Sequence, residues 1–441
     1  MENQIIIAAN DCCVFKNQEG HADAIQYFLS NRKLLNVFHF QQKEDDDNEI
    51  AIFNYRDAKW YAGRLIGEAT FIYNHTNYKI SIKPRFGNIQ LFKMLEEVFN
   101  IKLTNSNSKI EIQKEYQLLI KNIIAFLWLN MLSKANKHGI PKHNIKKTYK
   151  GTKIRGKLDV RKSMISIYAE EKISSNYVEK AADETIAKII KTAYKILKSE
   201  YNLGSIKPSL SAKNAIEQLF TSKVLEGYVS DNEYHKIQYK AIYLSFKPIV
   251  DLSWDIIKKK NFGNNDNNQS DAVSFFIDMA EIWEMYLRAI LKRNLAKEGW
   301  HLRNDSIKTY PNKDFSRKLI PDIVFEKESN VMVWDAKYKK MDFMYYDYDR
   351  SDFFQIHTYI SYYNQNKNVI AAGLLYPFSK EFDVIRQQKN SADTLFSENK
   401  TPISYKIDGI DYTNLSMEKM EIEETNFLNR ISSITKVRTN G

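Results

Sequence analysis

The sequence predicts a mixed α/β fold in three parts: an N-terminal α/β domain over residues 1–150, a mainly helical middle region over 151–265, and a C-terminal α/β domain over 266–441. Segments in which polar and apolar residues alternate, such as residues 78–83, predict strands. Apolar residues at intervals of three and four predict helices. At 441 residues the chain is also longer than one ordinary hydrophobic core supports.

The elements expected in the first two parts follow from these periodicities. Strands are expected at residues 4–8, 50–55, 69–73 and 78–84, and helices at 22–35, 91–99, 110–137 and over much of 180–240. The basic stretch 137–157 is interpreted as a solvated linker, with contact to a nucleic acid or partner as the alternative. The polar stretch 261–270 is expected to be a boundary loop before a helix over 272–297.

Composition limits the possible partners and compartments. The net charge of +11 makes a polyanion a plausible partner. Cys12 and Cys13 are the only cysteines, and adjacent cysteines rarely form a disulfide, which fits a reducing cytoplasm. The N-terminus lacks the basic and apolar regions of a signal peptide, and the most apolar long segment, residues 116–132, is short for a membrane span. We therefore expect a cytoplasmic protein without a membrane anchor.

One glycine pattern resembles a phosphate-binding loop. Gly151 and Gly156 precede Lys157 at the spacing of that loop, but Leu158 stands where a Ser or Thr would hold Mg²⁺. No apolar strand is expected before the pattern. We therefore expect that any nucleotide hydrolysis linked to this protein comes from another chain.

The C-terminal part contains a predicted β-hairpin of residues 319–326 and 331–337 joined by a polar turn at 327–330. If residues 326 and 331 flank that turn, Asp322 lies opposite Asp335. Opposed carboxylates in apolar strands repel each other unless a cation lies between them. Lys337, two residues beyond Asp335, projects from the same face of its strand. Two carboxylates beside an ammonium group are typical of Mg²⁺-dependent phosphodiester hydrolysis.

Further candidate residues lie around this hairpin. Mg²⁺, for which Mn²⁺ may substitute, is expected to bind Asp322, Asp335 and the Ala336 carbonyl, with Lys337 orienting the attacking water. On the helix expected over 351–364, Gln355 and Tyr359 share one side because they are four residues apart. Glu284 is a candidate for a further metal ligand, and Glu281 is its alternative. Lys339 and Lys340 are candidates for contacts with DNA phosphates. His357 is expected to be a core histidine.

Pro321-Asp322 followed by Asp335-Ala336-Lys337 matches the PD-(D/E)xK nuclease pattern. Together with other stretches, the chain resembles the McrC family, the nuclease subunits of McrBC-type modification-dependent (5-methylcytosine-specific) restriction systems. These stretches are KISIKPRFG, QLFKMLEEVF, IRGKLDVRKSM, DMAEIWEMYL, IPDIVF, VWDAKYK and DFFQIHTYISYY. The resemblance implies an N-terminal part that docks into a hexameric ring of the AAA+ GTPase McrB and stimulates its GTP hydrolysis, and a C-terminal restriction-endonuclease-like domain that cuts double-stranded DNA in antiviral defence.

The function expected is therefore a Mg²⁺-dependent DNA endonuclease that acts with a nucleotide-hydrolysing motor. Two alternatives remain open at this point. One is a non-catalytic factor that grips DNA and activates a motor, although the complete set of Asp322, Asp335 and Lys337 argues against it. The other is a stand-alone nuclease of the RecB type, which would cut DNA without a partner.

Overall fold

The computed structural model has the expected mixed α/β composition. It describes residues 4–31, 37–38, 53–99, 112–201, 203–206, 208–225, 227–262, 274–304, 306–308, 318–339, 349–378, 403–412 and 417–437. The chain forms two compact units, one of residues 1–106 with 270–441 and one of residues 107–269. The second unit is therefore inserted between two stretches of the first. The sequence-based boundaries were 150 and 265, and the first of these lies within a strand of the inserted unit.

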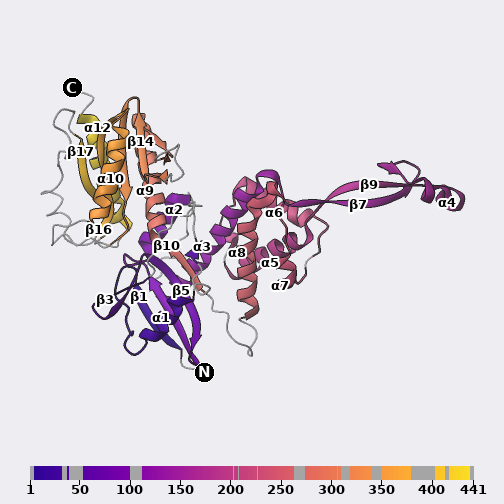
Figure 1. Ribbon diagram of the computed structural model, residues 1–441, viewed down its shortest axis with the longest axis horizontal. Coiled ribbons are helices and arrows are strands. Elements are labelled where there is room, and N and C mark those ends of the chain that lie inside the picture. The colour runs from indigo at the N-terminus through magenta and orange to yellow at the C-terminus, as the bar shows by residue number, and fades with distance from the viewer. Residues whose placement is uncertain are drawn as a thin grey trace. The chain divides into compact units, whose positions relative to one another are not determined.

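The N-terminal part of the first unit is built on a five-stranded sheet (Figure 1). In spatial order its strands are β1 (Ile5–Asn10), β6 (Thr76–Lys83), β5 (Leu65–Tyr73), β10 (Ser274–Asp278) and β2 (Val37–Phe38). Asn74 and His75, both with positive φ, form the two-residue loop between β5 and β6, the backbone that tight hairpins require. Beside the sheet are α1 (Ala22–Ser30), α2 (Asn88–Phe99) and the hairpin of β3 (Phe53–Arg56) and β4 (Lys59–Ala62).

Most strands and helices expected in this part are confirmed, with shifted ends, and β10 is the exception. Residues 274–278 were expected to begin the helix over 272–297, but they form a strand antiparallel to β5. Asp278 ends the strand and caps the next helix, its side chain accepting from the Ala280 N–H at 2.9 Å. We call the described residues 4–99 together with β10 the N-terminal module. Of the residues expected as a loop at 261–270, the first two instead end the helix of residues 247–262, and 263–270 lie outside the described part of the chain.

The C-terminal module comprises the described residues of 279–437. Its five-stranded mixed sheet has the order β11 (His301–Arg303), β14 (Ile323–Lys327), β15 (Asn330–Ala336), β16 (Asn368–Phe378) and β17 (Ser404–Asp411). Its helices are α9 (Met279–Leu295), α10 (Arg350–Tyr363) and α12 (Met417–Val437), and a two-stranded sheet pairs β12 (Ile307–Lys308) with β13 (Lys318–Leu319). The core under α10 contains Val324, Val331, Val333, Ile356 and Ile360.

The hairpin register predicted from the sequence is confirmed within β14 and β15. Ile323 pairs with Trp334, and Glu326 pairs with Val331. The turn is tighter than expected, because Lys327 and Asn330 are themselves paired and leave only a two-residue loop. The first strand is also shorter than expected, since β14 begins at Ile323 and Ile320 is 55% exposed. Asp322 therefore lies just outside the ladder and not within it.

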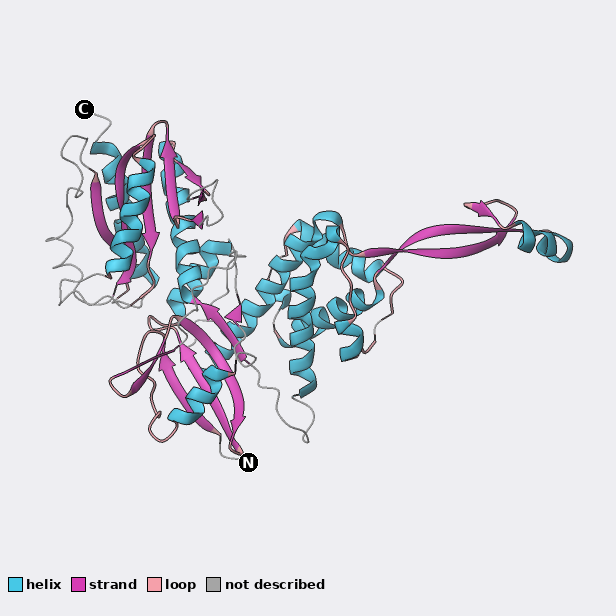
Figure 2. Cartoon of the chain, viewed as in Figure 1, coloured by secondary structure: helices cyan, strands magenta, loops and turns pink. Residues whose placement is uncertain are grey.

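The inserted unit consists of a helical body and a long arm (Figure 2). The body contains α3 (Ile112–Ala135), α5 (Glu184–Glu200), α6 (Leu210–Thr221), α7 (Asp231–His235) and α8 (Lys247–Phe262). The arm contains β7 (Lys142–Gly151), β8 (Lys157–Leu158), α4 (Val160–Glu170) and β9 (Ile173–Ala182). The interpretation of residues 137–157 as a linker was wrong, because ten of them form β7, which pairs along its length with β9. None of the helices in the described parts of the chain is long and apolar enough to cross a membrane.

Candidate active site

Two carboxylates meet where the hairpin strands of the C-terminal module approach α10. Asp335, near the end of β15, is completely buried. Asp322 precedes β14, and its Oδ2 accepts a hydrogen bond from the backbone N–H of Ala336 at 2.8 Å. Arg288 of α9 also donates to the carbonyl of Asp322. The side chain of Asp322 thus contacts the strand that carries Asp335, although the backbone of Asp322 lies outside the β-ladder.

Lys337 follows β15 and is held by side chains from two elements. Its Nζ lies 2.6 Å from Oδ2 of Asp335 and donates to Oε1 of Gln355 at 2.8 Å. The Gln355 amide nitrogen donates to the Tyr359 hydroxyl at 3.0 Å, and that hydroxyl donates to the carbonyl of Ile320 at 3.3 Å. The structure therefore brings together five side chains singled out from the sequence, namely those of Asp322, Asp335, Lys337, Gln355 and Tyr359.

Sequence reasoning missed Asp352. This residue, in the first turn of α10, is only 5% exposed, and its Oδ1 lies 3.4 Å from Nζ of Lys337. Its Oδ2 forms an ion pair with Lys339 and accepts from the Tyr376 hydroxyl at 3.4 Å. Asp352 lies three residues before Gln355 and seven before Tyr359, so all three share one side of the helix. That spacing was a signal in the sequence that could have identified it.

Burial and like charge dominate the electrostatics of the site. Burial raises the pKa of Asp335 to about 8, and the nearby Asp322 carboxylate adds to the rise, while Lys337 opposes it. Burial by itself would lower the pKa of Lys337, but the charge and hydrogen bond of Asp335, together with the charges of Asp352 and Asp322, outweigh burial and raise that pKa. Burial also raises the pKa of Tyr359 to about 12. Lys337 and Tyr359 are therefore fully protonated at neutral pH, whereas Asp335 binds a proton readily.

Residues 64–377 match the model of a protein family described as the McrBC 5-methylcytosine restriction system component. The chain belongs to this family. A comparison with curated protein sequences finds no significant match.

Two solved structures are similar to this family member at low identity. One is the half-complex of Thermococcus gammatolerans McrB AAA+ hexamers with bound McrC. The two chains are 15% identical, the match covers 97% of this chain and 100% of that chain, and the TM-score is 0.46. The other is the cryo-EM structure of the Thermococcus gammatolerans McrBC complex, with 13% identity, 66% and 88% covered, and a TM-score of 0.31. The family assignment rests on the match to the family model.

The donor set of this McrBC-family chain fits a Mg²⁺ ion. Both Asp335 oxygens are buried, and Oδ1 has no hydrogen bond among the described residues. A divalent cation would supply that missing partner and would offset the repulsion between Asp335 and Asp322. Within the described part of the chain no group of three or more His, Cys, Asp or Glu side chains forms a metal site. Mg²⁺ does not need one, because it binds through one or two carboxylates and keeps several waters.

The other residues predicted for the site differ in where they lie and in what they contact. Glu281 and Glu284 are both buried on α9, and neither completes a three-carboxylate group with Asp322 and Asp335 in the described chain. Lys339 pairs with Asp349 at 3.0 Å in addition to Asp352, whereas Lys340 lies outside the described residues. His357 is a core histidine as expected, since its Nδ1 lies 2.9 Å from the carbonyl oxygen of Phe353.

Proposed function

We propose that this chain is the DNA-cleaving subunit of a McrBC-type restriction system and that it acts as a Mg²⁺-dependent endonuclease. The observation that carries the proposal is the position of Lys337, whose Nζ lies 2.6 Å from Asp335 and 2.8 Å from Gln355. Asp322, the residue before β14, adds a second carboxylate through its hydrogen bond to the Ala336 N–H. A non-catalytic protein would not need to place the Asp322 carboxylate beside the fully buried Asp335 carboxylate, because their mutual repulsion and the desolvation of Asp335 are costly. Family membership supports the same conclusion.

Each residue of the site has a chemical role in this proposal. Asp322, Asp335 and the Ala336 carbonyl would hold the ion, which when bound polarises the scissile phosphate and lowers the pKa of an attacking water. Lys337 orients that water toward the phosphorus. Gln355 fixes the position of the Lys337 ammonium and is itself fixed by Tyr359. A set of groups held in place before the substrate binds can stabilise the charge that develops in the transition state.

The test is cleavage of methylated plasmid DNA by the purified chain with its motor partner, in Mg²⁺, comparing Asp335→Asn with Glu326→Gln. Both changes neutralise a carboxylate of the same hairpin, but Glu326 pairs with Lys367 and Arg303 away from the site. We expect Asp335→Asn to slow cleavage by more than roughly 100-fold, the upper end of losses on altering residues that merely support a metal ligand. Glu326→Gln should cut at the wild-type rate. Equal rates for Asp335→Asn and wild type would refute the assignment.

The partner in this proposal is a ring-forming AAA+ GTPase of the same restriction system. The glycine pattern at residues 151–157 does not supply a nucleotide site of this chain, because Gly151 ends β7 and Lys157 lies in the strand β8. Phosphate-binding loops instead lead into a helix N-terminus. Hydrolysis would therefore be carried out by the partner, as the family description of a system component suggests.

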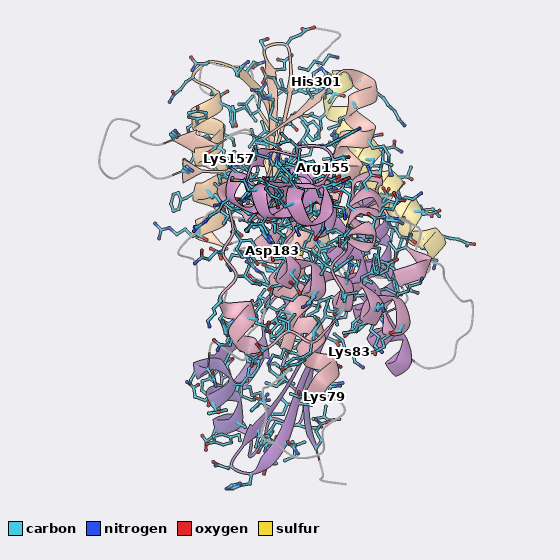
Figure 3. All side chains as sticks on the ribbon, turned by 90° about the vertical axis from the view of Figure 1, so that its right-hand side faces the viewer. Lys79, Lys83, Arg155, Lys157, Asp183 and His301 are labelled. Carbon is cyan, nitrogen blue, oxygen red and sulfur yellow. The ribbon has the colours of Figure 1, made fainter. Side chains whose placement is uncertain are left out.

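The arm is the surface that we assign to this partner. The side of α4 that packs on β9 carries serines. Ser163 and Ser166 are almost fully buried, and Ser163 Oγ donates to the Ser174 carbonyl at 2.8 Å. The apolar side of α4 is exposed instead, with Ile165 71% and Tyr168 93% accessible. Arg155 and Lys157 add positive charge at the same end of the ribbon (Figure 3). A contiguous exposed apolar surface of this kind marks a protein interface.

Stimulation of the partner's GTP hydrolysis tests the arm. We expect Ile165→Asp to abolish the stimulation, because a carboxylate would have to be buried in the interface, while α4 keeps its serine contacts with β9. The matched control is Ile422→Asp, at an isoleucine of α12 that is 57% exposed. If Ile165→Asp stimulated the partner's GTP hydrolysis as well as the wild type does, the arm would not be the partner-binding surface. Cleavage without any motor would favour the stand-alone nuclease, and stimulation without cleavage would favour the non-catalytic activator.

A further inference from the structure

A sequence motif of the N-terminal module lies against the end of the strand that carries Lys337. The motif, KPRFG at residues 83–87, begins at the last residue of β6 and has no part in the chemistry proposed above. The Arg85 guanidinium lies over the ring of Tyr338, 4.5 Å from its centroid. Phe86, the next residue, packs its ring 5.4 Å from that of Tyr412, which follows β17. The motif therefore contacts the C-terminal module just beyond two of its strands.

Arg85 is anchored to the N-terminal module by a buried carboxylate. Asp11, directly after β1, has no exposed surface, and its Oδ1 accepts the backbone N–H of Arg85 at 2.5 Å. Nη1 of Arg85 lies 3.8 Å from Oδ2 of the same residue. Burial raises the pKa of Asp11, whereas the Arg85 charge lowers it. A buried carboxylate paired with a buried guanidinium is costly to separate, so the position of Arg85 is closely tied to the N-terminal sheet.

Tyr338 transfers that constraint to the site because it is the residue after Lys337. The last backbone contact of this strand is the N–H of Lys337, which donates to the Leu375 carbonyl at 2.9 Å. Beyond this point the ladder ends, and Tyr338, only 4% exposed, is held by its side chain under Arg85. Fixing Tyr338 limits rotation about the backbone that it shares with Lys337. The direction in which the Lys337 side chain leaves the strand therefore depends on the N-terminal module.

We propose that Asp11, Arg85 and Tyr338 form a joint through which the N-terminal module positions Lys337. The inference rests on the proposed function in that it takes Lys337 as the residue that orients the attacking water. Arg85 is a positioning residue here, since it touches neither the carboxylates of the site nor Lys337. A displacement of Asp11 or Arg85 in the N-terminal module would therefore reach the site through this joint.

The test compares Arg85→Met with Lys93→Met in the full chain. Both changes remove a buried cation of the N-terminal module that contacts the C-terminal module, with side chains 9% and 10% exposed. Lys93 pairs with Glu424 of α12 at 3.5 Å, far along the chain from Lys337. The first measurement is amide hydrogen exchange of the peptide covering residues 333–339, which reports local opening whether or not the chain cuts DNA. The second is the cleavage rate with motor and Mg²⁺, resolved into kcat and KM.

We expect Arg85→Met to speed exchange in this peptide several-fold and to lower kcat by roughly 10- to 100-fold, because small misplacements of a catalytic group cost that much. KM for DNA should change little, and Lys93→Met should leave both the peptide and kcat unchanged. Equal exchange in Arg85→Met and wild type, or equal effects of the two variants, would overturn the proposal.

A second variant covers the case in which Arg85→Met does not fold. Arg85→Lys keeps a positive charge beside Asp11 but removes the planar group over Tyr338. It should therefore fold and still speed amide exchange in residues 333–339. Exchange at the wild-type rate in Arg85→Lys would also contradict the proposed joint. Failure of the proposed function would look different, because the wild-type chain would then cut no DNA while the exchange difference between Arg85→Lys and Lys93→Met persisted.

Discussion

The carboxylate of Asp322 is fixed to the backbone N–H of Ala336, with 2.8 Å between Oδ2 and the nitrogen. This one hydrogen bond ties the residue that precedes β14 to the peptide that follows Asp335. It holds two carboxylates together that would otherwise separate, since like charges in neighbouring strands repel. The backbone of the hairpin therefore holds the two carboxylates close together, and a divalent ion bound as we propose would not need to reorganise the strands.

Magnesium binding should release protons at neutral pH. The pKa of Asp335 is raised to about 8 by burial and by Asp322, so this carboxyl is largely protonated below that pH and must lose its proton to bind a metal. We expect titration calorimetry at pH 7 to give binding enthalpies that differ between buffers of different ionisation enthalpy. The apparent affinity should rise with pH up to about 8. Asp335→Asn should show no proton release.

The same shift predicts how the stability of the metal-free chain changes with pH. Between the ordinary value of 3.8 and about 8, the folded state holds a proton on Asp335 that the unfolded state has lost. The contribution of this group to the free energy of unfolding therefore falls as pH rises through that window. Asp335→Asn should flatten the dependence in urea unfolding measured from pH 5 to 8. A dependence unchanged by the substitution would mean that Asp335 is ionised throughout.

Asp352→Asn should slow cleavage without weakening magnesium binding. Asp352 contacts Lys337 and Lys339 but not the two carboxylates of the hairpin, so its loss leaves the proposed metal donors intact. Each lysine would lose one carboxylate partner and keep another, Asp335 for Lys337 and Asp349 for Lys339. We expect kcat to fall by roughly 10- to 100-fold, as for other residues that orient a catalytic group. Asp352→Glu should restore part of the activity because it keeps the charge. A weaker magnesium affinity in Asp352→Asn would instead place this residue among the ligands.

The hairpin could be predicted from the sequence because its determinants are local. The alternation around Asp322 and Asp335 and the short polar turn set the register, and the structure has that register. The strand β10 could not be predicted in the same way. Its partner is β5, some two hundred residues earlier in the chain, and a short apolar run before a helix is ambiguous by periodicity alone.

The arm and Asp352 were missed for different reasons. The sequence of β7 is rich in lysine, which suggested a solvated linker, but its exposed residues alternate with half-buried ones, and a strand without a fully buried face needs no continuous apolar side. The helical spacing of Asp352 from Gln355 and Tyr359 was a signal in the sequence, but the contact of Asp352 with Lys337 depends on how α10 packs on the sheet. The joint at Arg85 likewise depends on contact between two modules. Contacts of this kind leave no periodic pattern in one sequence.

Tyr359→Phe should lower the cleavage rate only slightly. The size of this loss shows whether the Tyr359 hydroxyl supports Lys337 or acts on the substrate itself. The hydroxyl of Tyr359 accepts from Gln355 and donates to the Ile320 carbonyl, so it acts on Lys337 only through Gln355. We expect a loss of about 2 kcal/mol in the free energy of unfolding, because two hydrogen bonds are removed and each contributes about 1 kcal/mol. Gln355→Ala should slow cleavage more than Tyr359→Phe does, because it removes the direct contact with Lys337. The reverse order would mean that the Tyr359 hydroxyl itself meets the substrate.

Lys339 should contribute little to the salt dependence of DNA binding. It was predicted to contact phosphates, yet in the structure its ammonium is paired with Asp349 and Asp352. A lysine that neutralises one phosphate contributes about 1 to the slope of log affinity against log salt concentration. Because Lys339 is already paired, we expect Lys339→Ala to leave that slope unchanged while kcat falls through the loss of its contact with Asp352. Fluorescence anisotropy with a DNA duplex at several salt concentrations measures the slope, and a decrease of about 1 would show that Lys339 leaves its carboxylates to bind a phosphate.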